Sequence, residues 1–141
     1  MIEVTLDLMN GEFGFAAKDS FGHIVNTDTS ADNGGINTGV RPMQLLLMGL
    51  GSCSGIDIVS ILKKQKQKIK DFKMHIKGQR EKDKVPALWE TVHMVFELTG
   101  NIDEEKAKRA CTLSVDKYCS VAETLRRAGA TITWEVKVNV Q

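Results

Sequence analysis

The chain has 141 residues, of which 42% are hydrophobic and 26% charged, as in ordinary globular domains. Nineteen basic residues balance eighteen acidic ones, giving a net charge of +1. Because neither sign dominates, nothing favours nucleic acid or an anionic membrane as a partner. We therefore expect a single domain over residues 1–141 that binds no nucleic acid and no membrane.

Short strands followed by a loop are predicted for the N-terminal segment, residues 1–40. Apolar and polar side chains alternate over residues 2–8, and two further apolar clusters, at 13–15 and 24–25, suggest a second and a third strand. Residues 26–40 are rich in Asn, Asp, Thr, Ser and Gly, which predicts a long surface loop. The first residues show neither the basic nor the apolar region of a signal peptide, so we expect a cytoplasmic protein.

A long buried helix is predicted at the centre of the chain, within residues 41–70. Pro42 suits the first turn of a helix, and twelve of the twenty residues from Met43 to Leu62 are apolar or Cys. A helix that is apolar on most of its circumference is a buried one. Its longest unbroken apolar run, residues 45–51, is too short to span a membrane.

The remaining segment, residues 71–141, begins with a predicted hairpin. Apolar and polar residues alternate over 72–77 and again over 88–98, with a charged turn between the two runs. The acidic residues at 103–105 are typical of the first turn of a helix. A hairpin followed by a helix is therefore expected in this part of the chain.

A further helix and a last strand complete the predicted order. Ser120 followed by Glu123 has the spacing of a capping box. A new helical segment is therefore expected to begin near Cys119 and to end at Gly129. Alternation over residues 132–140 predicts the last strand.

This order of elements predicts the α+β class with mostly antiparallel sheet. A helix of twenty residues spans about 30 Å, and a chain of this size with a few strands can hardly cover it on all sides. We therefore expect a homodimer in which the two central helices are buried together.

Three cysteines, Cys53, Cys111 and Cys119, are the candidate reactive residues. Their number is odd, their spacings match no zinc motif, and no two histidines have metal-ligand spacing. We therefore expect thiols rather than a disulfide scaffold, with no metal or other cofactor. In the cytoplasm such thiols are normally reduced.

Each candidate has two interpretations. Cys53, inside the central helix, is either a small apolar core residue or a redox thiol in a close-packed pocket. Cys119, next to backbone N–H groups at a helix N-terminus, is either a hydrophobic contact or a thiol with a lowered pKa. Cys111 lies on an apolar stripe and is interpreted as a core residue. Asp57, one turn after Cys53, is interpreted as a hydrogen-bonded acid in preference to a proton-handling group.

Two segments carry a family resemblance. Residues 41–54, RPMQLLLMGLGSCS, and residues 117–122, KYCSVA, resemble the two cysteine motifs of the OsmC/Ohr family of thiol peroxidases. The resemblance implies an OsmC-like fold, with antiparallel sheets around the long central helix in an intertwined homodimer. It also implies that Cys53 attacks a peroxide and that Cys119 resolves the resulting sulfenic acid to a disulfide. The implied substrates are organic hydroperoxides, and the implied reductant is a dithiol.

The sequence departs from the family's peroxidases at the residues that activate the thiolate. Met43 stands where these enzymes have a Glu, and residues 1–40 contain no Arg. Arg41 and Gln44 are the candidates to support Cys53 in their place. This pattern resembles a branch described only as OsmC-like redox proteins. Two functions stay open: thiol-dependent reduction of organic hydroperoxides, and non-catalytic binding of an apolar small molecule or lipid by a dimer of the same fold.

Overall fold

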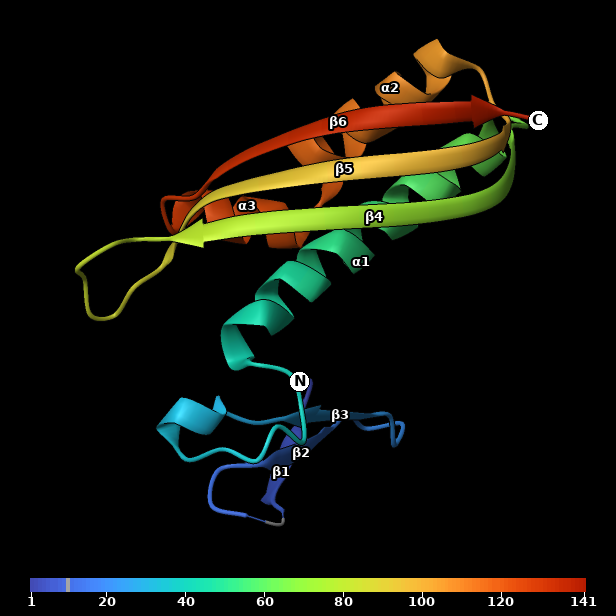
Figure 1. Ribbon diagram of the computed structural model, residues 1–141. Coiled ribbons are helices and arrows are strands. Elements are labelled where there is room, and N and C mark those ends of the chain that lie inside the picture. Colours follow the sequence, from blue (N-terminus) through green and yellow to red (C-terminus); the bar gives the residue numbers. More distant parts are fainter. Residues whose placement is uncertain (10) are drawn as a thin grey trace. The chain divides into compact units, whose positions relative to one another are not determined.

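The computed structural model describes residues 1–9 and 11–141 of the chain (Figure 1). The chain forms two compact units, Met1–Leu46 and Leu47–Gln141. Each unit contains a three-stranded sheet. The mixture of helices and strands confirms the α+β class.

The N-terminal unit contains the three short strands that were predicted. They are antiparallel in the order β1-β2-β3 and are followed by a short 3-10 helix: β1 (Thr5–Leu8), β2 (Phe15–Lys18), β3 (Ile24–Thr27) and η1 (Ala31–Asn33). Many apolar side chains of this unit are exposed, among them Ile2, Val4, Leu6, Leu8, Phe21 and Ile24. Exposed apolar surface of this extent is typical of an interaction face.

Asp28 organises the segment that was predicted only as a surface loop. Its carboxylate is buried. It accepts hydrogen bonds of 2.7–3.1 Å from the backbone N–H groups of Thr29, Ile36 and Thr38 and from the Thr38 hydroxyl. These bonds, led by that from the Thr38 N–H, lower the pKa of Asp28 to about 2, because they stabilise the charged form. One side chain therefore joins three separate positions of the loop, in addition to the loop's own backbone hydrogen bonds.

The predicted central helix is confirmed as α1 (Pro42–Lys64), which is continuous. Leu50, Ile58 and Leu62 are fully buried in the core of the C-terminal unit, whereas Ile56 is 71% exposed. The helix is therefore covered on one face within the chain and uncovered on another. Its length and hydropathy alone would allow it to cross a membrane, although no unbroken apolar run of that length is present in the sequence.

Two glycines bring α1 close to the second sheet. An added Cβ at Gly51 would collide with Cδ1 of Ile76, and one at Gly55 would lie 3.0 Å from Cε of Met74. Both Ile76 and Met74 belong to the strand that α1 faces. Glycine lowers the helix propensity of this segment, but here it allows α1 to pack closely against the sheet.

The second sheet has the order β4-β5-β6, with β4 (Lys68–Arg80), β5 (Trp89–Asn101) and β6 (Thr131–Val140). The predicted hairpin is confirmed, since β4 and β5 are antiparallel. The sheets are mostly antiparallel, as expected, but the last strand differs, because β6 runs parallel to β5. The helices between β5 and β6 carry the chain back along the sheet, and a crossover of this kind joins parallel strands.

The core lies between one face of this sheet and the three helices (Figure 1). Inward-facing side chains of β5 alternate with outward-facing ones, and Val92, Met94, Phe96 and Leu98 are all essentially inaccessible to solvent. Alternation at this period is what places one side of a strand in the core.

Two α-helices and an intervening π-helical turn connect β5 to β6: α2 (Glu104–Leu113), η2 (Ser114–Tyr118) and α3 (Ser120–Arg127). Asp103 caps α2 by accepting a hydrogen bond of 3.0 Å from the Lys106 N–H. The predicted capping box at Ser120 is wrong. The N-cap of α3 is Cys119, whose sulfur accepts from the Ala122 N–H at 3.4 Å, while Glu123 forms ion pairs with arginines of its own helix. The helix ends just before Gly129, as expected.

Candidate functional site: a thiol pair between two helices

Cys53 and Cys119 come together in the C-terminal unit. Cys53 lies on α1 and is half-buried, and Cys119 begins α3 and is only 2% exposed. Both are free thiols, and they lie close enough for Cys53 to raise the pKa of Cys119. Two residues 66 positions apart in sequence are therefore adjacent in space, which is the arrangement that a reversible disulfide requires.

The surroundings of Cys119 keep its thiol protonated. Its sulfur accepts hydrogen bonds from the Ser54 hydroxyl and from the Ala122 N–H, both at 3.4 Å. Burial raises the pKa of Cys119, and the two donors lower it, but the adjacent Cys53 raises it again, so that the net change is upward. Of the two interpretations of Cys119, the thiol with a lowered pKa is therefore wrong, because desolvation of a buried thiolate outweighs two uncharged donors.

Ser114 ties the two helices together next to the thiols. Its hydroxyl lies 3.0 Å from the Ser54 carbonyl oxygen and 3.1 Å from Oδ2 of Asp57, and it donates to both acceptors on α1. Its own carbonyl accepts from the Cys119 N–H at 2.8 Å. Ser54 and Ser114 are both fully buried. The interpretation of Asp57 as a hydrogen-bonded acid is confirmed by this contact.

Neither serine was singled out by the sequence analysis. A serine inside the apolar stretch of α1 is a weak signal, since small residues are common where helices pack closely. What distinguishes Ser54 is that its hydroxyl donates to a side chain of another element rather than to its own helix. That property belongs to the tertiary structure alone.

Arg41 and Gln44, the two supporting residues suggested by the sequence, lie in the N-terminal unit. The Arg41 guanidinium donates to the Gly39 carbonyl oxygen at 2.9 Å and to Oδ1 of Asn37 at 3.1 Å. Gln44 is exposed in the first turn of α1. Arg41 is thus held at the start of the helix by the loop before it.

Cys111 is a core residue, as interpreted. It is fully buried on α2, and burial raises the pKa of its thiol to about 12. A thiol of this kind has almost no thiolate at neutral pH, which is the nucleophilic form. Cys53 and Cys119 are therefore the remaining candidates for a reactive thiol.

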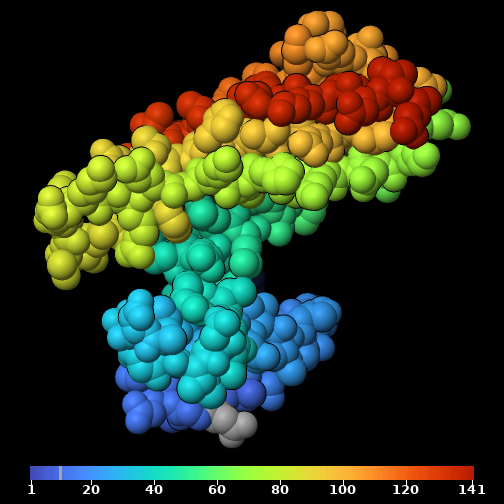
Figure 2. Space-filling model, viewed as in Figure 1, coloured from blue at the N-terminus to red at the C-terminus, as the bar shows by residue number. Residues whose placement is uncertain are grey.

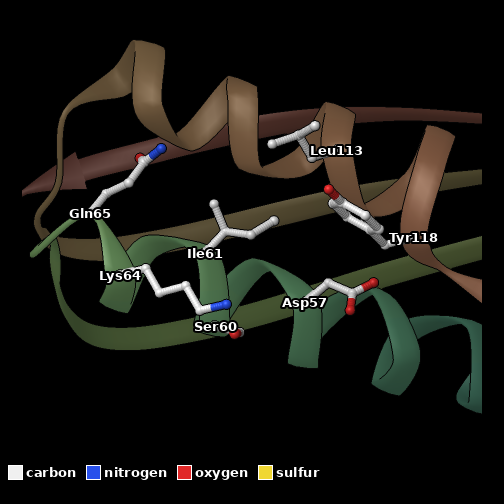
Figure 3. A pocket seen from close by; sticks show the side chains of 7 residues that line it. All are labelled: Asp57, Ser60, Ile61, Lys64, Gln65, Leu113 and Tyr118. Atoms are coloured by element: carbon white, nitrogen blue, oxygen red, sulfur yellow. The ribbon is translucent and has the colours of Figure 1, made fainter.

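Two hollows lie along α1, and residues of that helix form part of the lining of each. One of about 580 Å³ is formed by α1 with the end of α2 and the π-helical turn, and Figure 3 shows Asp57 and Tyr118 at one end of it and Gln65 at the other. A second, of about 560 Å³, has an apolar lining that includes Ile56 on α1 and Phe72 and Met74 on β4. Both have the size of small-molecule sites.

The fold and the thiol pair define a small α+β protein with a two-cysteine site, and comparison with known proteins gives its family. The family model described as OsmC-like protein matches residues 33–135. Protein YhfA of Escherichia coli (strain K12) is 35% identical over 115 residues, which cover 81% of this chain and 82% of that protein. The chain belongs to the OsmC-like family.

Solved structures agree with this assignment. A hypothetical protein from Aquifex aeolicus VF5 has a TM-score of 0.81 at 36% identity, covering 99% of this chain and 98% of that one. The organic hydroperoxide resistance protein OhrB of Bacillus subtilis shares the fold, with a TM-score of 0.68 at 21% identity over 97% of this chain and 98% of that one. In this fold α1 is the core helix and not a membrane span.

Proposed function

We propose that this protein is a thiol-dependent redox protein that reduces organic hydroperoxides, with Cys53 as the peroxidatic and Cys119 as the resolving cysteine. The observation that carries the proposal is the proximity of two free thiols, Cys53 on α1 and Cys119 at the N-cap of α3. Membership of a family that includes organic hydroperoxide resistance proteins supports the choice of substrate.

The proposed cycle has three balanced steps. The Cys53 thiolate attacks one peroxide oxygen, so that an S–O bond forms and the O–O bond breaks. The departing alkoxide takes up the proton that the Cys53 thiol had lost and leaves as the alcohol. The sulfur of Cys119 then attacks that of Cys53. An S–S bond forms, the S–O bond breaks, and water carries away the hydroxyl group together with the Cys119 proton. A dithiol finally reduces the disulfide by exchange and becomes a disulfide itself.

The different environments of the two thiols favour this division of roles. Cys53 is half-buried, so a small hydroperoxide can approach it, whereas Cys119 is enclosed. Cys119 also holds its proton, because burial and Cys53 raise its pKa. A protonated Cys119 brings the proton that the leaving water needs.

Arg41 and Gln44 are proposed as supporting residues in the assembled protein. A cation near a thiolate favours the ionised form, and Arg41 is the first arginine of the chain. We expect Arg41→Ala to slow the oxidation of Cys53 several-fold, with no change for the control Arg109→Ala, which removes an exposed arginine of α2. Equal oxidation rates in Arg41→Ala and wild type would remove Arg41 from the site.

The proposed functional unit is a cytoplasmic homodimer built from the whole chain as one domain. The uncovered face of α1 bears Leu46, Met48 and Ile56, each at least 41% exposed. The N-terminal sheet is likewise apolar and exposed. A second copy of the chain would remove both surfaces from water, at roughly 25 cal/mol for each Å² of apolar area.

Thiol titration tests the proposed function. One equivalent of cumene hydroperoxide should remove two of the three thiols, and mass spectrometry should find the peptides of Cys53 and Cys119 joined. Cys53→Ser should abolish the loss, while Cys111→Ser should leave it in place. Three thiols that persist in wild type after peroxide would refute the proposal.

A second candidate, binding of an apolar small molecule without catalysis, is favoured by one observation, the apolar hollow between α1 and β4. A fluorescent fatty acid should then bind, and Ile56→Asp should weaken its binding. Thiols that persist after peroxide, together with saturable binding of the fatty acid, would support the binding function. A disulfide that forms on addition of peroxide would support hydroperoxide reduction.

A further inference from the structure

Ser114 holds a position that the cysteine chemistry alone does not explain. It is the first residue of the π-helical turn Ser114–Tyr118, which separates α2 from α3 and ends at Cys119. Single π-helical turns inside helices are rare and are frequent at functional sites. The turn closes with the hydrogen bond of 2.8 Å from the Cys119 N–H to the Ser114 carbonyl oxygen. The backbone of Cys119 is therefore anchored to Ser114.

The side chain of Ser114 is anchored to the helix that carries the other thiol. Its single hydroxyl hydrogen is shared between the Ser54 carbonyl oxygen at 3.0 Å and Oδ2 of Asp57 at 3.1 Å. Ser54 follows Cys53 directly in sequence, and its own hydroxyl donates to the sulfur of Cys119. One residue thus links the backbone of Cys119 to the backbone beside Cys53.

Burial makes this link rigid. Ser54 and Ser114 have no accessible surface, so water cannot replace either hydrogen bond, and a buried acceptor left without its donor is costly. Asp57 is half-buried at the edge of the hollow in Figure 3. Its Oδ2 accepts from the Ser114 hydroxyl at 3.1 Å and so restricts the directions that this hydroxyl can take.

We infer that Ser114 is a positioning residue for the thiol pair, and that Asp57 orients it. The inference rests on the proposed function, because it concerns the step in which Cys119 closes the disulfide on Cys53. A disulfide needs its two Cα atoms within about 7 Å and its sulfurs at about 2.05 Å. Because Ser114 links the two backbones, it influences how often the two thiols reach that geometry. Ser114 acts through the position of the thiols and not through contact with the peroxide or the reductant.

The first test is the thiol–disulfide equilibrium against mixtures of reduced and oxidised dithiothreitol, with the joined peptides of Cys53 and Cys119 counted by mass spectrometry. We expect Ser114→Ala to lower the equilibrium constant for the disulfide about tenfold, since a small displacement of reacting groups has a large effect. Asp57→Asn should lower it about threefold. Thr112→Ala is the matched control, because its hydroxyl also donates to a carbonyl oxygen, that of Lys108 at 3.0 Å, but on the exposed side of α2. It should stay within twofold of wild type.

The second test separates positioning from a merely structural role. After one equivalent of cumene hydroperoxide, Cys53 should be oxidised at the wild-type rate in Ser114→Ala, but its sulfenic acid, trapped with dimedone, should persist about tenfold longer. A variant that is only less stable would show no such accumulation when assayed well below its unfolding temperature.

The outcomes distinguish the two proposals. A wild-type protein that forms no sulfenic acid refutes the peroxidase function, while the dithiothreitol equilibrium still tests Ser114. If Ser114→Ala is folded and its equilibrium stays within twofold of wild type, the inference is overturned. If Ser114→Ala does not fold, Asp57→Asn decides, and an unchanged equilibrium in that variant overturns the inference equally.

Discussion

Cys119 has two roles in this structure, since its sulfur caps α3 and also faces Cys53. A cap needs an acceptor for the orphan N–H groups of the first turn, and resolution of a sulfenic acid needs a thiol. Substitution can separate these requirements, because serine accepts hydrogen bonds but forms no disulfide.

Cys119→Ser should therefore stay within about 1 kcal/mol of the wild-type stability, whereas Cys119→Ala should lose about 1 kcal/mol more through the missing cap. Both variants should fail to form the peroxide-dependent disulfide. Urea unfolding together with thiol counting measures both effects. Equal stability of the two variants would contradict the capping role.

Because Cys111 is buried, it should make the free energy of unfolding depend on pH, and the direction of that dependence follows from the burial. The pKa of its thiol is raised to about 12 in the folded protein, against about 8.5 in an unfolded chain. The folded state therefore keeps a proton that the unfolded state releases. This contribution to stability is complete below about pH 8.5 and is lost as the pH rises toward 12, at up to about 1.4 kcal/mol per pH unit.

Comparison of Cys111→Ala with wild type isolates the effect from other groups that titrate at high pH. The free energy of unfolding should fall less steeply in the variant between about pH 8.5 and pH 11. Parallel curves, offset only by a constant loss from the smaller side chain, would show that Cys111 does not titrate in this way.

At the scale of elements, the loop after β3 depends on one carboxylate. Hydrogen bonds lower the pKa of Asp28 to about 2, below the usual value of about 3.9. The stabilisation is therefore present above about pH 4 and is lost as the pH falls toward 2. Amide hydrogen exchange of Ile36 and Thr38, whose N–H groups bind this carboxylate, should accelerate in that range.

Asp28→Asn supplies the control, because an amide keeps one acceptor oxygen and does not titrate. Exchange of the same two amides should be faster than in wild type at neutral pH and independent of pH between 4 and 2, apart from the intrinsic chemical rate. Wild-type protection that does not change with acid would contradict the role assigned to Asp28.

The elements themselves differ in how far the sequence predicts them. The period-two alternation of β4, β5 and β6 and the apolar stretch of α1 are local signals, and all four elements are confirmed. The direction of β6 has no local signal, since a strand of the same residues can pair either way. The π-helical turn before Cys119 also lacks one, because its geometry follows from the contacts of Ser114 with α1.

At the scale of the whole molecule, the uncovered face of α1 is the basis for the proposed dimer. Sedimentation at micromolar concentration should show no major monomer. Ile56→Glu should weaken association at least tenfold, because a charge would be buried without a partner. Val85→Glu is the matched control, since Val85 is fully exposed at the tip of the β4–β5 hairpin.

A compact wild-type monomer at micromolar concentration would contradict the proposal that this face of α1 is buried in a dimer. An Ile56→Glu protein that remains as dimeric as Val85→Glu would show that association, if present, uses another surface.

Local periodicity and two short cysteine motifs were enough to predict the fold class, the central helix and the family resemblance. They also indicated which two thiols to compare. The proximity of Cys53 to Cys119, and the upward direction of the pKa change at Cys119, follow from the folded structure instead. The physical reason is that contact, burial and hydrogen bonding between α1 and α3 depend on residues distant in sequence, above all Ser54 and Ser114, whose hydroxyls carry no signal until the helices are packed.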